Sequence, residues 1–257
     1  MKLTILGSGT FFVDKDVTAS AFVLETKESK ILIDCGPGTL IKLAKAGIKP
    51  EDLDYVMITH FHPDHSSDLF PLFMNYRLSD FFEPEKLKKH PTFLGPEGFS
   101  DFLLKYSQLS ELPAYEGYDK IKVEEYKPEM KLKDFTLKTF KTSHTAFNVQ
   151  AKSYALRIEA EGKTIAFSGD AAKCEGLEKV SENADIFVCD TSYPKGKSAP
   201  SHLDTSDIGE IAKKSKVKKL ILDHFYPQFS NYDLVGEVRD IYDGEVIKAK
   251  DLDIINI

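Results

Sequence analysis

The segment from His60 to His65, "HFHPDH", gathers three histidines and one aspartate, although the 257-residue chain has only seven histidines. His60 and His62 are two positions apart, so in an extended segment their side chains point to the same side and can hold one cation. Asp64 and His65 follow Pro63, where the chain turns, and can reach a second cation. Imidazole nitrogens and a carboxylate oxygen are the ligands of zinc-type hydrolytic sites.

The apolar run at 52–59, directly before these histidines, predicts a buried strand that delivers them at its end. A histidine-rich surface turn is the alternative interpretation. Burying four such groups without a cation would be costly, because polar groups would stay unpaired and protons would repel each other. Delivery by an apolar strand therefore favours a metal site.

Short apolar runs alternate with helical patterns along the rest of the chain. Further strands are predicted at 2–9, 20–26, 30–36, 135–144, 153–160, 163–170, 185–193 and 217–224. Helices are predicted at 37–47, 68–82, 177–184 and 205–216, the second of them interrupted near Pro71. The region 81–130 is the least regular, and both loops over a pocket and a plain surface excursion remain open. Without a low-complexity linker, one domain over 1–257, with helices covering mixed sheets, is the simplest packing.

Four of the apolar runs end in a histidine or an aspartate, namely His60, Asp170, Asp190 and His224. In layered α/β folds the side chains at one edge of the sheets converge on a crevice. A single such residue is explained by a turn or a helix cap, whereas four in one chain indicate a functional site.

The sequence "THFHPDH" resembles the His-x-His-x-Asp-His signature of the metallo-β-lactamase superfamily. The resemblance extends over nearly the whole chain, because "LTILGSGT", "ILIDCGPGTLIKL", "KTIAFSGD", "SHLDTSDIGEIA" and "VKKLILDHFYP" are similar to motifs of the ribonuclease Z-like branch, in the same order. That branch also contains cyclic-nucleotide phosphodiesterases. The resemblance implies an α/β fold of four αββα layers, in which two mixed sheets pack face to face with helices outside.

The resemblance also implies two divalent metal ions and their ligands. The first ion would be held by His60, His62 and His144, and the second by Asp64, His65 and His224, with Asp170 bridging both. Such a pair activates a water molecule and neutralises charge on a phosphoryl oxygen. Zinc is the metal we expect, while manganese and iron stay open on ligand type alone. We expect no other cofactor.

The resemblance implies that His202, which matches a substrate-facing histidine of that branch, protonates the departing oxygen. An acidic residue at the position of Asp190 orients it, so the expected catalytic residues are Asp64, His202 and Asp190. The alternative makes His202 a neighbour of a helix cap at Asp204 or Thr205. Asp34 in "LIDCG" is expected to brace a ligating histidine.

The substrate is less sharply predicted than the metal site. Ribonuclease Z enzymes that mature transfer RNA carry a long arm between the motifs of His144 and Asp170, but here only residues 145–169 lie there, predicted as two strands and a hairpin. In addition, Asp68 and Ala171 replace a glycine and a threonine that are usual in the family. A small phosphodiester such as a cyclic nucleotide is therefore favoured, and RNA 3′-end processing is the runner-up. A lactone or ester hydrolase, and a metal-stabilised binding protein without turnover, are the remaining alternatives.

The composition limits the expected binding partners and the expected cellular compartment. The net charge is −7 and no run of lysines or arginines forms a basic tail, so nucleic acid is not a favoured partner. No segment approaches the ~18 apolar residues of a membrane span, and the first residues are too short an apolar run for a signal peptide. Three cysteines without metal-type spacing favour a reducing compartment, the cytoplasm. The resemblance leaves a homodimer open.

Overall fold

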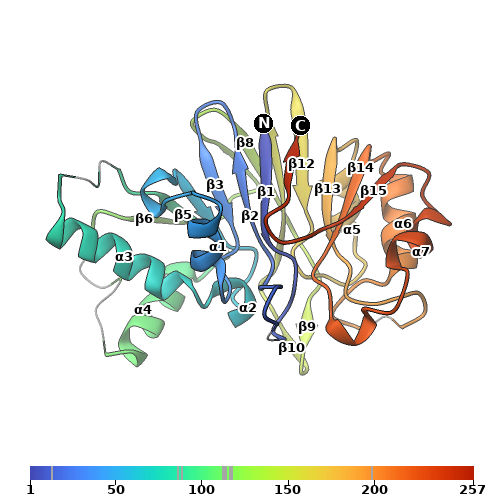
Figure 1. The fold of residues 1–257 in the computed structure, drawn as a ribbon, viewed down its shortest axis with the longest axis horizontal. Helices are drawn as coiled ribbons and strands as arrows, with labels where there is room; N and C mark the ends of the chain where they lie inside the picture. The colour runs from blue at the N-terminus through green and yellow to red at the C-terminus, as the bar shows by residue number, and fades with distance from the viewer. Residues whose placement is uncertain (13, 86, 88, 112–114, 116–117, 198) are drawn as a thin grey trace.

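The structure is a computed structural model that describes residues 1–257 apart from 13, 86, 88, 112–114, 116–117 and 198. Two seven-stranded sheets form its centre, and helices lie on the outer side of each (Figure 1). Each sheet contains both parallel and antiparallel neighbours. The predicted α/β class, with mixed sheets packed face to face and helices outside, is confirmed.

The first sheet has the strand order β16-β1-β2-β3-β4-β5-β6. Its antiparallel part contains β16, β1, β2 and β3, and the pairs from β3 to β6 are parallel. The strands are β1 (Lys2–Gly7), β2 (Ala21–Glu25), β3 (Lys30–Ile33), β4 (Tyr55–Met57), β5 (Thr92–Gly95), β6 (Lys122–Glu125) and β16 (Ile254–Asn256).

The second sheet has the order β15-β14-β13-β12-β11-β8-β7, and its parallel part runs from β12 to β15. The strands are β7 (Glu129–Lys131), β8 (Thr136–Lys141), β11 (Tyr154–Ala160), β12 (Lys163–Phe167), β13 (Ile186–Asp190), β14 (Lys219–Asp223) and β15 (Glu245–Lys248). A separate hairpin, β9 (Thr145–Ala146) and β10 (Val149–Gln150), projects from the lower edge of the sheets in Figure 1.

Helices cover the two sheets from opposite sides (Figure 1). The α-helices are α1 (Thr39–Lys45), α2 (Pro63–Ser66), α3 (Leu69–Phe82), α4 (Phe99–Leu109), α5 (Glu175–Ser181), α6 (Thr205–Lys214) and α7 (Leu234–Arg239). Two 3₁₀ turns are η1 (Pro50–Asp52) and η2 (Pro227–Phe229). In the part of the chain that is described, no helix is long and apolar enough to cross a membrane.

Three apolar clusters hold these layers together. The central one lies between the sheets and takes side chains from both, including Leu3, Leu24, Leu156, Ile158 and Phe167. The second packs the first sheet against α1, α3 and α4, and the third packs the second sheet against α5, α6 and α7. Because alternate side chains of a strand point to opposite faces, each sheet contributes to the central cluster and to one outer cluster.

The structure corrects two expectations from the sequence. Pro71 does not interrupt the helix at 69–82, because it lies in the first turn of α3, where a backbone N–H has no partner within the helix. The region 81–130 contains β5, α4 and β6 rather than loops alone. Their apolar side chains Phe93, Phe99 and Leu103 belong to the buried cluster under α3.

Strands of both sheets deliver polar residues to one edge of the sandwich. β4 leads into His60, β12 into Asp170, β13 ends at Asp190, and β14 leads into His224. Parallel pairing places the ends of β12, β13 and β14 side by side, and Asp190 is the register partner of Asp223. The convergence that the strand-end residues predicted is therefore found at this edge.

The central apolar cluster makes a test of the fold. Ile158 is fully buried in it, so Ile158→Ala should lower the free energy of unfolding by about 2–5 kcal/mol. The matched control Ile41→Ala truncates a side chain that is 64% exposed, and its effect should stay within about 0.5 kcal/mol. Urea denaturation of both variants measures the difference, and equal effects would contradict the packing described here.

Candidate metal centre

The structure brings all nine site residues expected from the sequence to one edge of the sandwich. Their ligand-type atoms form three groups, the last two of which share Asp170 and His224, and within each group the atoms lie within 4.8 Å of one another. The groups are His60, His62 and His144; Asp64, His65, Asp170 and His224; and Asp170, Asp190, His202 and His224. Eight of these nine residues are buried, and His62 is half-buried.

Hydrogen bonds fix the orientation of the His60 and His144 rings. The Thr59 hydroxyl donates to Asp34 at 2.9 Å, so it accepts the Nδ1 proton of His60 at 3.1 Å. His144 donates its Nδ1 proton to the carbonyl of Ser201 at 2.8 Å. Since the Nδ1 atoms carry the protons, the Nε2 atoms present lone pairs to the interior of the site.

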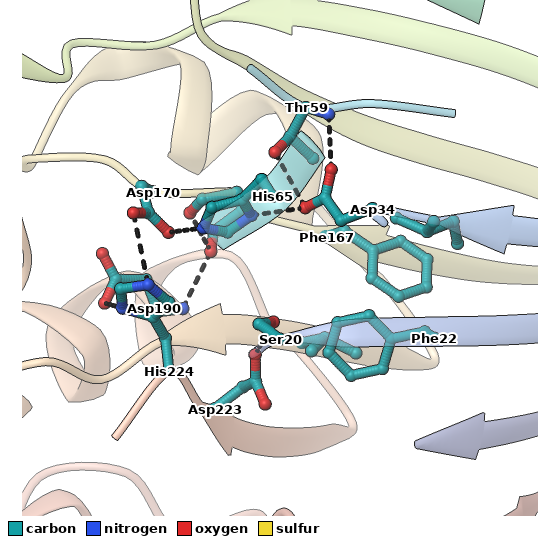
Figure 2. A pocket seen from close by; sticks show the side chains of 14 residues that line it. Ser20, Phe22, Asp34, Thr59, His65, Phe167, Asp170, Asp190, Asp223 and His224 are labelled. Atoms are coloured by element: carbon teal, nitrogen blue, oxygen red, sulfur yellow. Dashed lines mark hydrogen bonds and ion pairs between the residues drawn. The ribbon is translucent and has the colours of Figure 1, made fainter. Parts of the chain in front are cut away.

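His65 and His224 are held in the same way. His65 donates from Nδ1 to Asp34 at 2.8 Å, the bracing contact that the sequence suggested for this aspartate. The Ser192 hydroxyl donates to Asp190 at 2.5 Å, so it accepts the Nδ1 proton of His224 at 3.0 Å. Figure 2 shows the His65 ring between Asp34 and Asp170, and His224 facing the Asp170 carboxylate.

Asp170 lies between the two histidine groups. Its Oδ1 is 3.1 Å from His65 Nε2, and its Oδ2 is 3.3 Å from His224 Nε2. The same Oδ2 is 3.8 Å from the Nε2 atoms of His60 and His144. Atoms that bind one ion at ~2.0–2.2 Å are separated by distances of this order. The carboxylate is therefore placed to serve both groups.

Several of these atoms are buried without a hydrogen-bond partner. They are the Nε2 atoms of His60, His65 and His224 and the Oδ1 atom of Asp64. A buried polar atom without a partner is costly, and such atoms in native proteins point to an ion or a water. Imidazole nitrogens and carboxylate oxygens aimed at one centre are the donor set of divalent cations such as zinc.

The electrostatics of the cluster agree with a centre that requires positive charge. Burial alone would raise the pKa of Asp170, but His224 and His65 hold it well below its ordinary value. Burial alone would lower the pKa of His65, yet the carboxylates of Asp170, Asp64 and Asp34 raise it well above its ordinary value. By contrast, burial and the neighbouring His65 hold the pKa of His60 well below its usual range. Either protons or cations can supply the compensating charge, and they compete for the same atoms.

Two glycines allow the backbone segments of the site to approach each other. A Cβ on Gly36 would lie 1.6 Å from the carbonyl oxygen of Asp64, so only glycine fits beside α2. Gly169, directly before Asp170, has φ +56°, and a Cβ there would lie 3.0 Å from Cβ of Thr59. Larger residues at either position would move a ligand-bearing segment.

His202 and Asp190 form a pair against the cluster. His202 Nδ1 is 2.7 Å from Asp190 Oδ2, and the His202 ring lies 5.0 Å from the His144 ring and 5.3 Å from the His224 ring. Burial alone would lower the pKa of His202, but the charge and hydrogen bond of Asp190 raise it above its ordinary value. His202 is therefore readily protonated beside the cluster. The neighbouring helix α6 is capped by Asp204, which accepts from Ser206 N and Asp207 N, so capping needs no contribution from His202.

Sequence reasoning missed the groups that orient the histidines, namely Thr59, Ser192 and the carbonyl of Ser201. The position of Thr59 directly before His60 was the available signal. It also missed Asp223, whose pKa burial raises to about 7 and whose carboxyl accepts the Ser20 hydroxyl. Ser20 and Asp223 line a cavity of about 20 Å³ together with cluster residues such as His65 and Asp170 and with the rings of Phe22 and Phe167 (Figure 2). That volume is close to one water molecule.

The sequence matches the family described as Anti-Pycsar protein Apyc1 over residues 1–242. The chain is 26% identical over 255 residues to the probable metallo-hydrolase YhfI of Bacillus subtilis, with 97% of each protein covered. It is 25% identical over 299 aligned residues to ribonuclease Z of Thermococcus onnurineus, with 99% of this chain and 94% of that protein covered.

Solved structures show the same fold. The crystal structure of the metallo-β-lactamase fold protein YhfI from Bacillus subtilis has a TM-score of 0.84 at 23% identity, covering 99% of this chain and 98% of that one. The short form of human tRNase Z has a TM-score of 0.77 at 22% identity, covering 100% and 99%. Since the family match spans nearly the whole sequence, the chain belongs to the Anti-Pycsar protein Apyc1 family, in the ribonuclease Z-like branch of the metallo-β-lactamase superfamily.

Proposed function

We propose that this chain is a single-domain phosphodiesterase with two metal ions, and that it hydrolyses a small phosphodiester such as a cyclic nucleotide. The family of metallo-hydrolases to which it belongs implies divalent metal ions. The observation that carries the proposal is one juxtaposition: Asp170 belongs to one group of ligand-type atoms and lies 3.8 Å from two histidines of the other, and the paired His202 and Asp190 lie against them.

The residues take the following roles in this proposal. His60, His62 and His144 would hold one ion and Asp64, His65 and His224 the other, with the Asp170 carboxylate within reach of both groups. Zinc suits this donor set, and manganese or iron is the alternative. Ions held there lower the pKa of a shared water and neutralise charge on a phosphoryl oxygen.

His202 acts as the general acid. Asp190 holds its Nδ1 proton, so the Nε2 side of the ring can give a proton to the departing oxygen of the substrate. A metal-stabilised binding protein would need the ligand set but no oriented acid. The hydrogen bond between His202 and Asp190 therefore supports an enzyme. Asp190 also lies 3.5 Å from His224 Nδ1, so one carboxylate positions both the acid and a metal ligand.

The size of the loops supports a small substrate. Between His144 and Asp170 the chain forms the short hairpin β9–β10 and the strands β11 and β12, which leaves no segment for the arm expected of enzymes that mature transfer RNA. The net charge of −7 also disfavours a polyanionic partner. RNA 3′-end cleavage is the second candidate, because a relative over nearly the whole chain is named ribonuclease Z.

The cellular location and the oligomeric state of the protein stay predictions. A cytoplasmic location rests on the three unpaired cysteines, of which Cys35 and Cys189 are buried. A homodimer rests on the family resemblance alone.

The metal assignment predicts the ion content. The purified protein should contain close to two transition-metal ions per chain, and Asp170→Asn should lose at least one, because Asp170 reaches both groups. Metal analysis by mass spectrometry measures this, with Asp101→Asn on the exposed face of α4 as a control that keeps both ions. Full occupancy in the Asp170 variant would contradict the bridge.

The acid assignment predicts loss of turnover without loss of metal. His202→Ala should reduce kcat by about 10²-fold or more while metal content is unchanged. Asp190→Asn should also reduce kcat, since the ring loses its orientation and its counter-charge. His90→Ala, which removes a histidine paired with Asp80 outside the cluster, should leave kcat unchanged. Unaltered turnover in the His202 variant would remove the assignment.

The loop lengths predict the substrate ranking. A 3′,5′-cyclic nucleotide and bis(p-nitrophenyl) phosphate should be cleaved with a higher kcat/KM than precursor transfer RNA, and a lactone or carboxylic ester should be cleaved poorly. A panel assayed with the metal-loaded protein measures this ranking. If precursor transfer RNA were the best substrate, the second candidate would replace the first.

A further inference from the structure

One buried carboxyl group beside the metal cluster has a partner for only one of its two oxygens. Asp223, the last residue of β14, is 3% exposed, and its Oδ2 accepts the hydroxyl proton of Ser20. Its Oδ1 is buried and has no hydrogen-bond partner among the described residues. Asp190, the register partner of Asp223 on β13, uses both oxygens. Its Oδ1 accepts from Ser192 and its Oδ2 contacts His202. Since a buried polar atom without a partner is costly, Asp223 Oδ1 points to a ligand.

Asp223 lines the small cavity next to the cluster. The cavity has a volume of about 20 Å³, which is close to one water molecule. Its apolar wall comes from both sheets and consists of Phe22, Ile33, Phe167 and Val188. Its polar wall includes Ser20, Asp34, Thr59 and Ser168 in addition to Asp223. The cavity therefore lies where the apolar centre of the sandwich meets the metal cluster (Figure 2).

Water fits this cavity better than a further metal ion. Among the described residues, Asp223 belongs to none of the groups of ligand-type side chains that fit an ion. A buried water needs about two to four polar partners, and the polar wall offers them. A water molecule both donates and accepts hydrogen bonds, so it serves a carboxylate oxygen as well as a carboxylic acid. Its binding therefore does not depend on the protonation of Asp223.

The backbone has an uncommon conformation at three strand ends around the cavity. Asp34 follows β3, Gly169 follows β12 and His224 follows β14, and all three line the cavity. Their φ angles are +59°, +56° and +63°, which lie in the left-handed region. Residues other than glycine rarely adopt this region, and they keep it only when the surrounding contacts fix them. His224, directly after Asp223, is therefore a strained residue that needs fixed neighbours.

Both neighbours of His224 are linked to the first sheet. On one side, Asp223 accepts the hydroxyl proton of Ser20, the residue directly before β2. On the other side, Phe225 N donates to the carbonyl of Ser8, the residue directly after β1, at 3.0 Å. The segment at the end of β14 in the second sheet is thus held across the sandwich at two points. One of these points is the polar pair at the cavity.

We propose that the cavity binds one ordered water molecule at Asp223 Oδ1, and that Asp223, with this water and Ser20, is a positioning residue for His224. The inference rests on the proposed function for the role of His224 as a metal ligand. Without the polar pair, the link at Phe225 alone would hold the segment, and the strained His224 backbone would be free to relax away from its ion. The ion at His60 has no ligand on this segment, so its binding should not change.

A crystal structure of the metal-loaded protein tests the water site directly. Electron density for one water molecule is expected at about 2.5–3.0 Å from Asp223 Oδ1. Asp223→Leu keeps a side chain of similar size without polar atoms, so this density should be absent in its crystals. An empty cavity in the unaltered protein would overturn the proposal.

Zinc affinity, measured by competition with a chromophoric chelator, tests the positioning role without requiring turnover. Asp223→Leu should weaken the binding of one of the two ions by about 10- to 100-fold and leave the other unchanged. Asp223→Asn keeps an acceptor for Ser20 and a polar atom for the water, so it should bind both ions as the unaltered protein does. The control Asp101→Leu, on the exposed face of α4, should do the same. Equal weakening of both ions by Asp223→Leu, or of neither, would contradict the positioning role.

A smaller change covers the case in which Asp223→Leu does not fold. Ser20→Ala removes only the hydroxyl that Asp223 accepts, and it should weaken one ion by about tenfold. In crystals of this variant at limiting zinc, the anomalous peak beside His224 should fall while the peak beside His60 stays. Unchanged affinity for both ions would count against the link between the polar pair and His224.

Failure of the two proposals gives different results. If the metal-loaded protein cleaved no phosphodiester, the proposed function would be wrong, while the density at Asp223 and the zinc affinities would still decide the water site and the positioning role. If phosphodiesters were cleaved but the cavity was empty, or Asp223→Leu bound both ions unchanged, only the inference about Asp223 would be wrong.

Discussion

The structure depends on one electrostatic constraint: imidazole nitrogens and carboxylate oxygens are buried around a common centre with too few hydrogen-bond partners for all of them. Burial of such groups is tolerated when an opposite charge compensates them. The raised pKa of His65 and the lowered pKa of Asp170 express the same demand for positive charge. Divalent cations satisfy it with a fixed geometry, whereas protons satisfy it only over part of the pH range.

The two sheets and their loops serve to keep these atoms aimed at one point. Thr59, Asp34 and Ser192 hold the Nδ1 atoms of the ligand-type histidines, so the Nε2 atoms cannot turn away. Asp190 extends this support to His202, which links the position of the His202 ring to that of His224.

The sequence predicted the local part of this arrangement and not the long-range part. The spacing of His60, His62 and His65 within one segment is readable because strand geometry fixes their directions. His144, Asp170 and His224 were assigned through the family resemblance, since strand pairing across the sheets cannot be read from spacing. The strands β5 and β6 were missed because each has only four residues, too few to show a period. The helix α4 was readable, since Phe99, Phe102, Leu103 and Tyr106 follow helical spacing.

Anomalous X-ray diffraction from crystals of the purified protein, recorded at the absorption edge of the metal found in it, tests the central claim most directly. The account predicts two peaks on either side of the Asp170 carboxylate, about 3.5–4 Å apart, one against His60, His62 and His144 and the other against Asp64, His65 and His224. A crystal that contains the metal but shows no peak among these side chains, or shows them turned away from each other, would contradict it.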